Sequence, residues 1–161
     1  MVGENGAGKS TLCRAVCGIL RGASGSVAFG DELLSRRRRV RRSFFVQQDA
    51  DYQLYAANVA DEFMVGRRAS VEHRSRAAAA LADVGLAGLE ERHPLSLSGG
   101  QKQRLLLALA AVSDREVLVF DEPPPSAGAC EREPSVLTRK TSDRGIGSAD
   151  RSIACRDDVL R

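Results

Sequence analysis

The sequence predicts an α/β fold with a parallel β-sheet at its core, and three features of the chain indicate it. A glycine-rich turn over residues 3–8 is followed by apolar residues at helical spacing. A continuous apolar run, 116–120, ends at Asp121, which is typical of a strand buried on both faces of a parallel sheet. Residues 57–122 carry clear helical periodicity that leads into this strand.

Shorter elements can be assigned along the rest of the chain. Residues 25–30 alternate like a short strand between turn glycines, and residues 43–46 are a second strand candidate. Ser70 is a suitable N-cap for a helix over residues 71–84. A Leu- and Ala-rich helix is expected over residues 101–112.

Composition and charge are those of an ordinary globular protein of one domain. The chain has 161 residues, of which 43% are hydrophobic and 28% are charged. No apolar run approaches the roughly 20 residues that span a bilayer, and the first residues do not read as a signal peptide. The formal net charge of +3 does not demand a polyanionic partner. Any association with a membrane is therefore expected to come through a partner subunit.

Several conspicuous residues have plain structural interpretations. Cys13 and Cys17 lie one helical turn apart among apolar residues and are expected to be buried without a metal or a disulfide. The arginine-rich run 36–42 could bind nucleic acid. Because it contains no aromatic residue and precedes a buried strand, a solvated turn is favoured. His73 and His93 are expected at the surface, without ligand partners.

The glycine-rich turn fits the phosphate-binding pattern G-x-x-x-x-G-K-[ST]. Backbone N–H groups of the turn and the positive end of the following helix would cradle phosphate oxygens. Lys9 would neutralise the β- and γ-phosphates, and Ser10 would offer its hydroxyl to Mg²⁺. The residues expected to contact the nucleotide are Gly3, Asn5, Gly6, Gly8, Lys9, Ser10 and Thr11. The motif thus predicts a site for ATP and Mg²⁺.

A second glycine turn, Leu97-Ser98-Gly99-Gly100-Gln101, opens another helix. Its backbone N–H groups and the Ser98 hydroxyl can reach an anion. With this motif the chain resembles the ABC ATPases, whose signature sequence it matches. The resemblance implies that Ser98, Gly99, Gly100 and Gln101 contact the γ-phosphate of ATP held by the P-loop of a second subunit. Two ATPase subunits, identical or different, would then enclose the nucleotide between them.

Two further stretches are similar to the same family. Residues 118–123 resemble its Walker B strand, which implies that Asp121 holds Mg²⁺ and that Glu122 polarises the attacking water as general base. Gln48 lies in a stretch that resembles the Q-loop, which implies that it reaches towards Mg²⁺ and the water and links the site to transmembrane subunits. Residues 46–66 are most similar to the ATPases of energy-coupling-factor importers, which take up vitamins or transition-metal ions.

The resemblance covers residues 1–123, with a helical subdomain expected near residues 57–97. Before the P-loop, family members have a strand and an aromatic residue that stacks on adenine, and after Walker B they have a D-loop and a switch histidine. No counterpart of these is expected here, and residues 124–161 lose the likeness abruptly. Their low content of large apolar residues predicts disorder. The expected fold is a P-loop NTPase core of the ABC-ATPase type, incomplete at both ends.

The function implied by the resemblance is ATP binding and hydrolysis that drive solute import. Such a subunit would lie in the cytoplasm at the inner face of the membrane, held there by transmembrane partners. The missing D-loop and histidine would impair hydrolysis in this chain. Two other interpretations are an inactive remnant of an ABC ATPase and a soluble ABC protein that acts on nucleic acid or ribosomes. Ribosomal ABC factors carry two cassettes, so the transporter is favoured and no nucleic-acid partner is expected.

Overall fold

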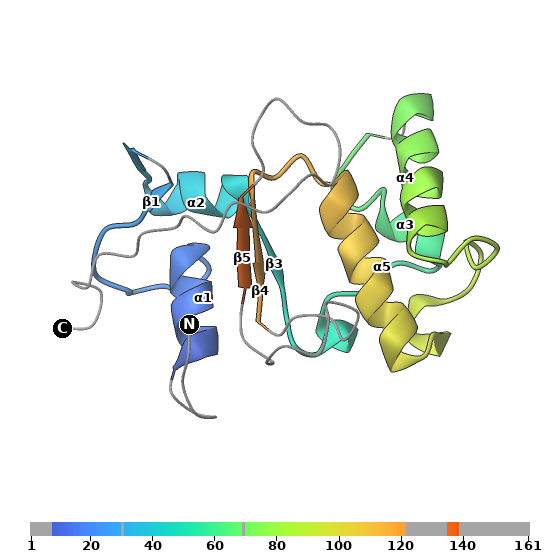
Figure 1. Ribbon diagram of the computed structural model, residues 1–161, viewed down its shortest axis with the longest axis horizontal. Coiled ribbons are helices and arrows are strands. Elements are labelled where there is room, and N and C mark those ends of the chain that lie inside the picture. The colour runs from blue at the N-terminus through green and yellow to red at the C-terminus, as the bar shows by residue number, and fades with distance from the viewer. Residues whose placement is uncertain (1–7, 30, 69, 122–134, 139–161) are drawn as a thin grey trace. The chain divides into compact units, whose positions relative to one another are not determined.

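The computed structural model describes residues 8–29, 31–68, 70–121 and 135–138, and the chain divides into two compact units (Figure 1). The first unit comprises the described residues up to Phe45 together with 115–121 and 135–138, and the second comprises those from Val46 to Asp114. The first contains α1 (Lys9–Val16), β1 (Ala28–Phe29), β2 (Glu32–Leu33), α2 (Arg36–Arg42), β3 (Ser43–Val46), β4 (Val117–Phe120) and β5 (Ser135–Thr138). The second contains η1 (Ala50–Tyr52), α3 (Val59–Glu62), α4 (Val71–Asp83), η2 (Pro94–Ser96) and α5 (Gly99–Val112).

The sheet of the first unit has the strand order β3-β4-β5. The strands predicted over residues 43–46 and 116–120 are confirmed as β3 and β4, the latter beginning one residue later. β5 pairs with β4 in the antiparallel direction, with Val119 opposite Val136. β5 lies within the tail for which the sequence predicts disorder, and the rest of residues 122–161 lies outside the described part of the chain.

A small antiparallel ribbon precedes this sheet in the chain. Within the strand predicted over residues 25–30, Ala28 and Phe29 form β1, which pairs with β2 so that Ala28 is opposite Leu33. The amide of Leu34 donates to the carbonyl of Val27 at 3.0 Å, which closes the ribbon. The ribbon brings Phe29 of β1 and the flanking residues Val27 and Leu34 over the core of the unit.

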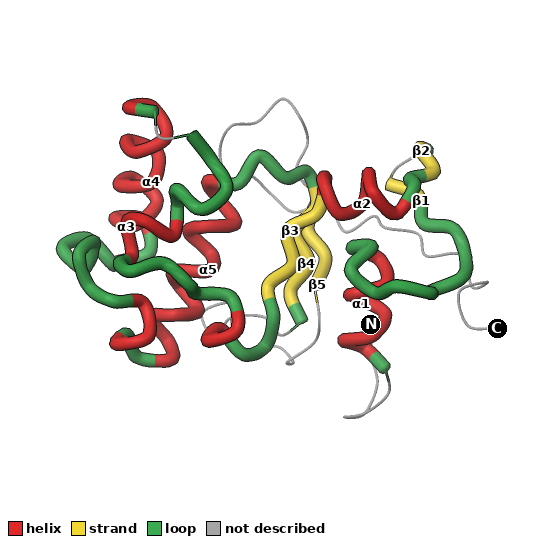
Figure 2. Tube along the Cα trace, turned by 180° about the vertical axis from the view of Figure 1, so that it is seen from behind, coloured by secondary structure: helices red, strands yellow, loops and turns green. Residues whose placement is uncertain are grey.

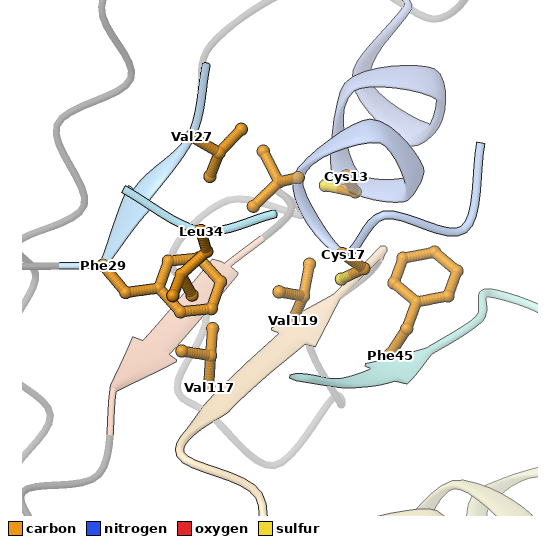
Figure 3. Packing of buried hydrophobic residues seen from close by; sticks show 9 residues of the cluster. Cys13, Cys17, Val27, Phe29, Leu34, Phe45, Val117 and Val119 are labelled. Atoms are coloured by element: carbon orange, nitrogen blue, oxygen red, sulfur yellow. The ribbon is translucent and has the colours of Figure 1, made fainter. Parts of the chain in front are cut away.

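One hydrophobic cluster holds the first unit together. Figure 3 shows side chains from α1, the ribbon, β3 and β4 pointing toward one another. Its buried members are Cys13, Val16, Cys17, Val27, Phe29, Leu34, Phe45, Val117 and Val119. Cys13 is 0% exposed and Cys17 is 1% exposed, which confirms their predicted burial. Both are free thiols. Burial of a large aliphatic or aromatic side chain contributes about 1.5–3 kcal/mol, so α1 is fixed to the sheet mainly by this face.

The arginine-rich run is a helix, α2, and not the predicted solvated turn. Arg39 is only 9% exposed, whereas Arg37 and Arg41 are exposed. The α2 backbone lies directly against the end of α1. A Cβ on Gly18, which has φ +74°, would come within 2.7 Å of the carbonyl oxygen of Arg36. Only glycine fits this junction, both for its conformation and for the space it occupies.

The second unit is helical, and α4 packs against α5 (Figure 2). Ser70 caps α4, because its hydroxyl accepts from the amide of His73 at 3.1 Å, as the sequence predicted. His73 itself is buried, which corrects the expectation that it lies at the surface. Its Nε2 bonds the carbonyl of Phe63 at 2.8 Å, so the ring joins α4 to the segment after α3. His93 is exposed, as expected.

The C-terminus of α4 is held by an arginine from α5. Nη1 of Arg104 donates to the carbonyl of Val84 at 3.0 Å, beside Gly85 with φ +66°. A cation near the last carbonyls offsets the negative end of the helix dipole. Within the described ranges, none of the helices is both long and apolar enough to cross a membrane.

Candidate functional site

The start of α1 has the geometry of a phosphate-binding helix terminus. Gly8 is the N-cap residue with φ +78°, a left-handed conformation that favours glycine, and its carbonyl accepts from the amide of Leu12 at 2.9 Å. Lys9, Ser10 and Thr11 form the first turn, which contains no acidic residue. Amides of a first helical turn have no carbonyl partner within the helix and point outward, so this end of α1 suits an anion.

The described part of the chain contains some of the predicted site residues and leaves out three of the P-loop and the predicted general base. Gly3, Asn5, Gly6 and Glu122 lie outside the described residues. The structure therefore describes the helical half of the predicted phosphate cradle and the residue just before the predicted base.

Asp121 follows β4 directly and lies on the side of the sheet that α1 covers. Val117 and Val119 pack against α1, and alternate residues of a strand face the same way. Burial raises the pKa of the Cys13 thiol to about 11, and the negative charge of Asp121 adds to this rise. The carboxylate is therefore close to α1, the helix that begins with Lys9 and Ser10.

The environment of Asp121 fits a magnesium ion. The residue is 6% exposed, and its Oδ1 has no hydrogen-bond partner among the described residues. A buried carboxylate oxygen without a partner is costly. Mg²⁺ prefers oxygen ligands, and in nucleotide sites it is held by one or two carboxylates with substrate phosphates. Asp121, with the Ser10 hydroxyl on the adjacent helix, supplies the chemistry that such an ion needs.

The signature turn opens α5 with a complete capping box. The Ser98 hydroxyl accepts from the amide of Gln101 at 3.4 Å, and Oε1 of Gln101 accepts from the amide of Ser98 at 2.9 Å. The helix begins at Gly99, two residues earlier than predicted. A Cβ on Gly99 or Gly100 would meet no neighbouring atom within 4 Å. Packing within this unit therefore does not require glycine at either position.

Gln48 is exposed between β3 and η1, and the turn after it is anchored to α5. Oε1 of Gln53 accepts from the amide of Gln47 at 2.7 Å, and Asp49 caps η1 by accepting from the amide of Asp51 at 3.0 Å. Nζ of Lys102, one turn into α5, lies 2.6 Å from Oδ1 of Asp51. This ion pair fixes the Q-loop turn to the signature helix. No local pattern indicates this ion pair, because its partners lie 51 residues apart.

The predicted site residues divide between the two units. The first unit brings together Gly8–Thr11 and Asp121, and the second contains Gln48 and Ser98–Gln101. In the first, α1, which begins with Lys9, and the Asp121 carboxylate lie on the same face of the sheet. In the second, the ion pair described above connects the two stretches.

Comparison with known proteins gives consistent matches. The family described as ABC transporter matches residues 1–124. A putative ABC transporter ATP-binding protein of Treponema denticola is 44% identical over 123 residues, which are 76% of this chain and 25% of that protein. The cobalt import ATP-binding protein CbiO of Rhodobacter capsulatus is 40% identical over 132 residues, which are 76% of this chain and 47% of that protein.

A solved structure agrees with these matches. The structure of cbiO1 from Clostridium perfringens, part of the ABC transporter complex cbiONQ, superposes with a TM-score of 0.64 at 33% identity. The match covers 76% of this chain and 52% of that one. This likeness confirms the predicted α/β fold class. The chain spans about a quarter to a half of the length of the relatives named here.

Proposed function

The chain belongs to the ABC transporter ATP-binding family, as its motifs predicted, and from this membership we propose that it is the nucleotide-binding part of an importer ATPase. Its first unit would bind ATP with Mg²⁺, and its second would present the signature turn to the nucleotide of another ATPase subunit. Transmembrane partners would hold both subunits at the cytoplasmic face of the membrane. Similarity to the cobalt import protein and to cbiO1 supports an importer of the energy-coupling-factor type.

The observation that carries the proposal is the unpaired Oδ1 of Asp121. It is buried at the end of β4, on the face that α1 covers, without a described partner. A buried carboxylate oxygen without a hydrogen-bond partner lowers the stability of a fold. Such groups are typical of sites whose ligand completes the hydrogen bonding or coordination.

In this proposal each residue has a separate role toward the triphosphate. The amides at the start of α1 donate to phosphate oxygens, and the Lys9 ammonium neutralises charge on the β- and γ-phosphates. The Ser10 hydroxyl and the Asp121 carboxylate would hold Mg²⁺, which supplies positive charge to the phosphate oxygens when bound. Glu122 would accept a proton from the attacking water, and Gln48 would orient that water.

The signature turn would act on the nucleotide of the partner subunit. Gly99 and Gly100 are exposed and unobstructed, so their amides can approach the γ-phosphate closely. We expect hydrolysis by a chain of this sequence to be slow, because residues 124–161 depart from the family's pattern, to which a D-loop and a switch histidine belong. Loss of one group that stabilises a transition state commonly costs a factor of about 10²–10³ in rate.

The proposal is tested by binding of Mg²⁺–ATP to the purified chain and to Lys9→Ala. Hydrogen bonds to charged groups are worth about 1.5–3 kcal/mol, so Lys9→Ala should weaken binding about 10- to 100-fold. Arg14→Ala is the matched control, since Arg14 is an exposed cation on the same helix. Binding that is equal in Lys9→Ala and the parent chain would overturn the proposed phosphate site.

A further inference from the structure

The C-terminus of α1 is bonded to a buried arginine of α2. Nη1 of Arg39 donates to the carbonyl of Ala15 at 2.7 Å, across 24 residues of sequence. The same carbonyl accepts from the amide of Gly18 at 3.0 Å. Arg39 is 9% exposed, and no carboxylate bonds it within the described ranges. The negative end of the helix is thus what compensates this guanidinium, which stays charged in proteins.

Burying an arginine in this way is expensive, and Nε of Arg39 even lacks a hydrogen-bond partner in the described structure. A charge removed from water without a full set of partners lowers stability. The neighbouring contact is equally constrained, because any side chain on Gly18 would collide with the carbonyl of Arg36. The Arg39 side chain and the Arg36 backbone carbonyl of α2 therefore both fix the position of the α1 terminus.

The other end of α2 is attached to the start of β4. Nε of Arg42 donates to Oε2 of Glu116 at 2.9 Å, and the amide of Glu116 donates to the carbonyl of Arg42 at 3.0 Å. β4 begins at the next residue and leads to Asp121. One short helix thus holds the far ends of the two elements that carry the nucleotide site, the C-terminus of α1 and the N-terminus of β4.

We propose that α2 sets the spacing between the phosphate-binding end of α1 and Asp121, and that Arg39 is the positioning residue through which it does so. The inference rests on the proposed function of that site. With a rise of 1.5 Å per residue, the eight residues of α1 span about 12 Å, so a shift at Ala15 is transmitted to Lys9 through a short rigid helix. Ser10 and Asp121 would then reach the same magnesium ion only while Arg39 holds α1 in place.

The test compares Mg²⁺–ATP binding by the parent chain with Arg39→Met, Arg39→Lys and Arg37→Met. Arg39→Met retains length and apolar volume but cannot donate a hydrogen bond. Arg39→Lys restores one donor and the charge, and Arg37→Met is the same change at an exposed position of α2. We expect Arg39→Met to raise the dissociation constant about three- to tenfold and to reduce the gain in affinity that Mg²⁺ provides. Arg39→Lys should recover most of the binding, and Arg37→Met should match the parent.

The binding stoichiometry separates positioning from simple loss of folded protein. A mispositioned site binds in full stoichiometry with a weaker dissociation constant, whereas irreversibly misfolded protein lowers the stoichiometry and leaves the constant unchanged. Reversible unfolding also weakens the apparent dissociation constant, so binding is compared under conditions where urea unfolding shows Arg39→Met to be fully folded. An unchanged dissociation constant in Arg39→Met, or an equal loss in Arg37→Met, would overturn the proposal.

Amide exchange of α1 gives a second readout that does not depend on nucleotide. Amides of residues 12–20 should exchange faster in Arg39→Met than in Arg37→Met, while those of β4 remain protected. If the parent chain shows no Lys9-dependent binding, the proposed function fails, and the exchange data then decide the role of Arg39. Equal exchange over residues 12–20 in the two variants would refute it.

Discussion

Arg42 and Glu116 are joined twice, once through their backbones and once through their side chains. The amide of Glu116 donates to the carbonyl of Arg42 at 3.0 Å, and the guanidinium of Arg42 donates from both Nε and Nη2 to Oε2 of Glu116. The carboxylate raises the pKa of Arg42, and Glu32, whose Oε2 lies 2.5 Å from Nη1, contributes to the same shift. Residues 74 apart in sequence are thereby fixed at the entry to β4.

The energetic coupling of Arg42 and Glu116 should be measurable by a double-mutant cycle. Unfolding of Arg42→Ala, Glu116→Ala and the double variant should give a coupling energy of about 0.5–1 kcal/mol, since both side chains are partly exposed. The coupling should fall in 1 M NaCl because salt screens partly exposed charges. A cycle between Arg41 and Glu116 should give no coupling, because the Arg41 side chain is exposed and makes no ion pair in the described structure. Equal coupling in both cycles would contradict the specific pairing.

Asp121→Asn should separate magnesium binding from folding. The amide cannot supply a negatively charged oxygen, so ATP affinity should become nearly independent of Mg²⁺. The free energy of unfolding without ligand should stay the same or rise, because a buried charge with an unpaired oxygen is removed. Asp31→Asn, at an exposed carboxylate of the same unit, should alter neither property. A stability loss with unchanged magnesium dependence would mean that Asp121 is structural.

Two substitutions at Ser98 should distinguish helix capping from nucleotide contact. Ser98→Ala removes the hydroxyl that caps α5 and should cost about 1 kcal/mol in urea unfolding. Ser98→Asp keeps a good N-cap and should retain that stability, but its negative charge opposes a triphosphate. Without ATP, both variants should be monomeric. If the signature turn contacts ATP on a second subunit, Ser98→Asp should stay monomeric when Mg²⁺–ATP is present, whereas Ser98→Ala should form dimers. Sedimentation velocity measures this, and ATP-dependent pairing of Ser98→Asp would exclude the contact.

The buried thiols should make stability decline at alkaline pH. Burial raises the pKa from 9.0 to about 11 for Cys13 and to about 12 for Cys17. Above pH 9 the unfolded chain therefore loses thiol protons that the folded chain keeps, and unfolding becomes easier as pH rises toward 11–12. Each thiol should contribute up to about 1.4 kcal/mol per pH unit to the slope. Cys17→Ala should flatten the pH dependence of unfolding relative to the parent, and an identical slope would argue against a raised pKa.

Thiol labelling gives an independent check at neutral pH. Because the thiolate is the reactive form, iodoacetamide at pH 8 should leave Cys13 and Cys17 unmodified in the folded chain. Both should react after denaturation in urea, which peptide mass spectrometry can assign to each residue. Rapid modification of either residue without denaturant would contradict the packing of α1 against the sheet.

Local sequence patterns were enough to predict several of the elements and the family. Lys9–Val16, Ser43–Val46 and Val71–Asp83 have local signals: a glycine turn before helical spacing, a short β-prone run, and a serine N-cap. The capping box at Ser98 also arises from residues three apart, so its pattern is visible along the chain. Interactions over such short separations are encoded in adjacent residues, and for that reason the motifs could be recognised.

Which polar residues are buried, and what they bond, depends instead on how the elements pack together. The run of arginines looks uniform in sequence, yet within α2 Arg39 is the buried residue, and its guanidinium bonds the end of α1 because the helix turns it inward. His73 likewise was expected at the surface and instead joins α4 to Phe63. β5 was missed because its pairing with β4 depends on backbone hydrogen bonds to a distant strand, whose register no local pattern specifies. Burial of a charged or polar side chain depends on partners far along the chain, and these exist only once the elements have packed.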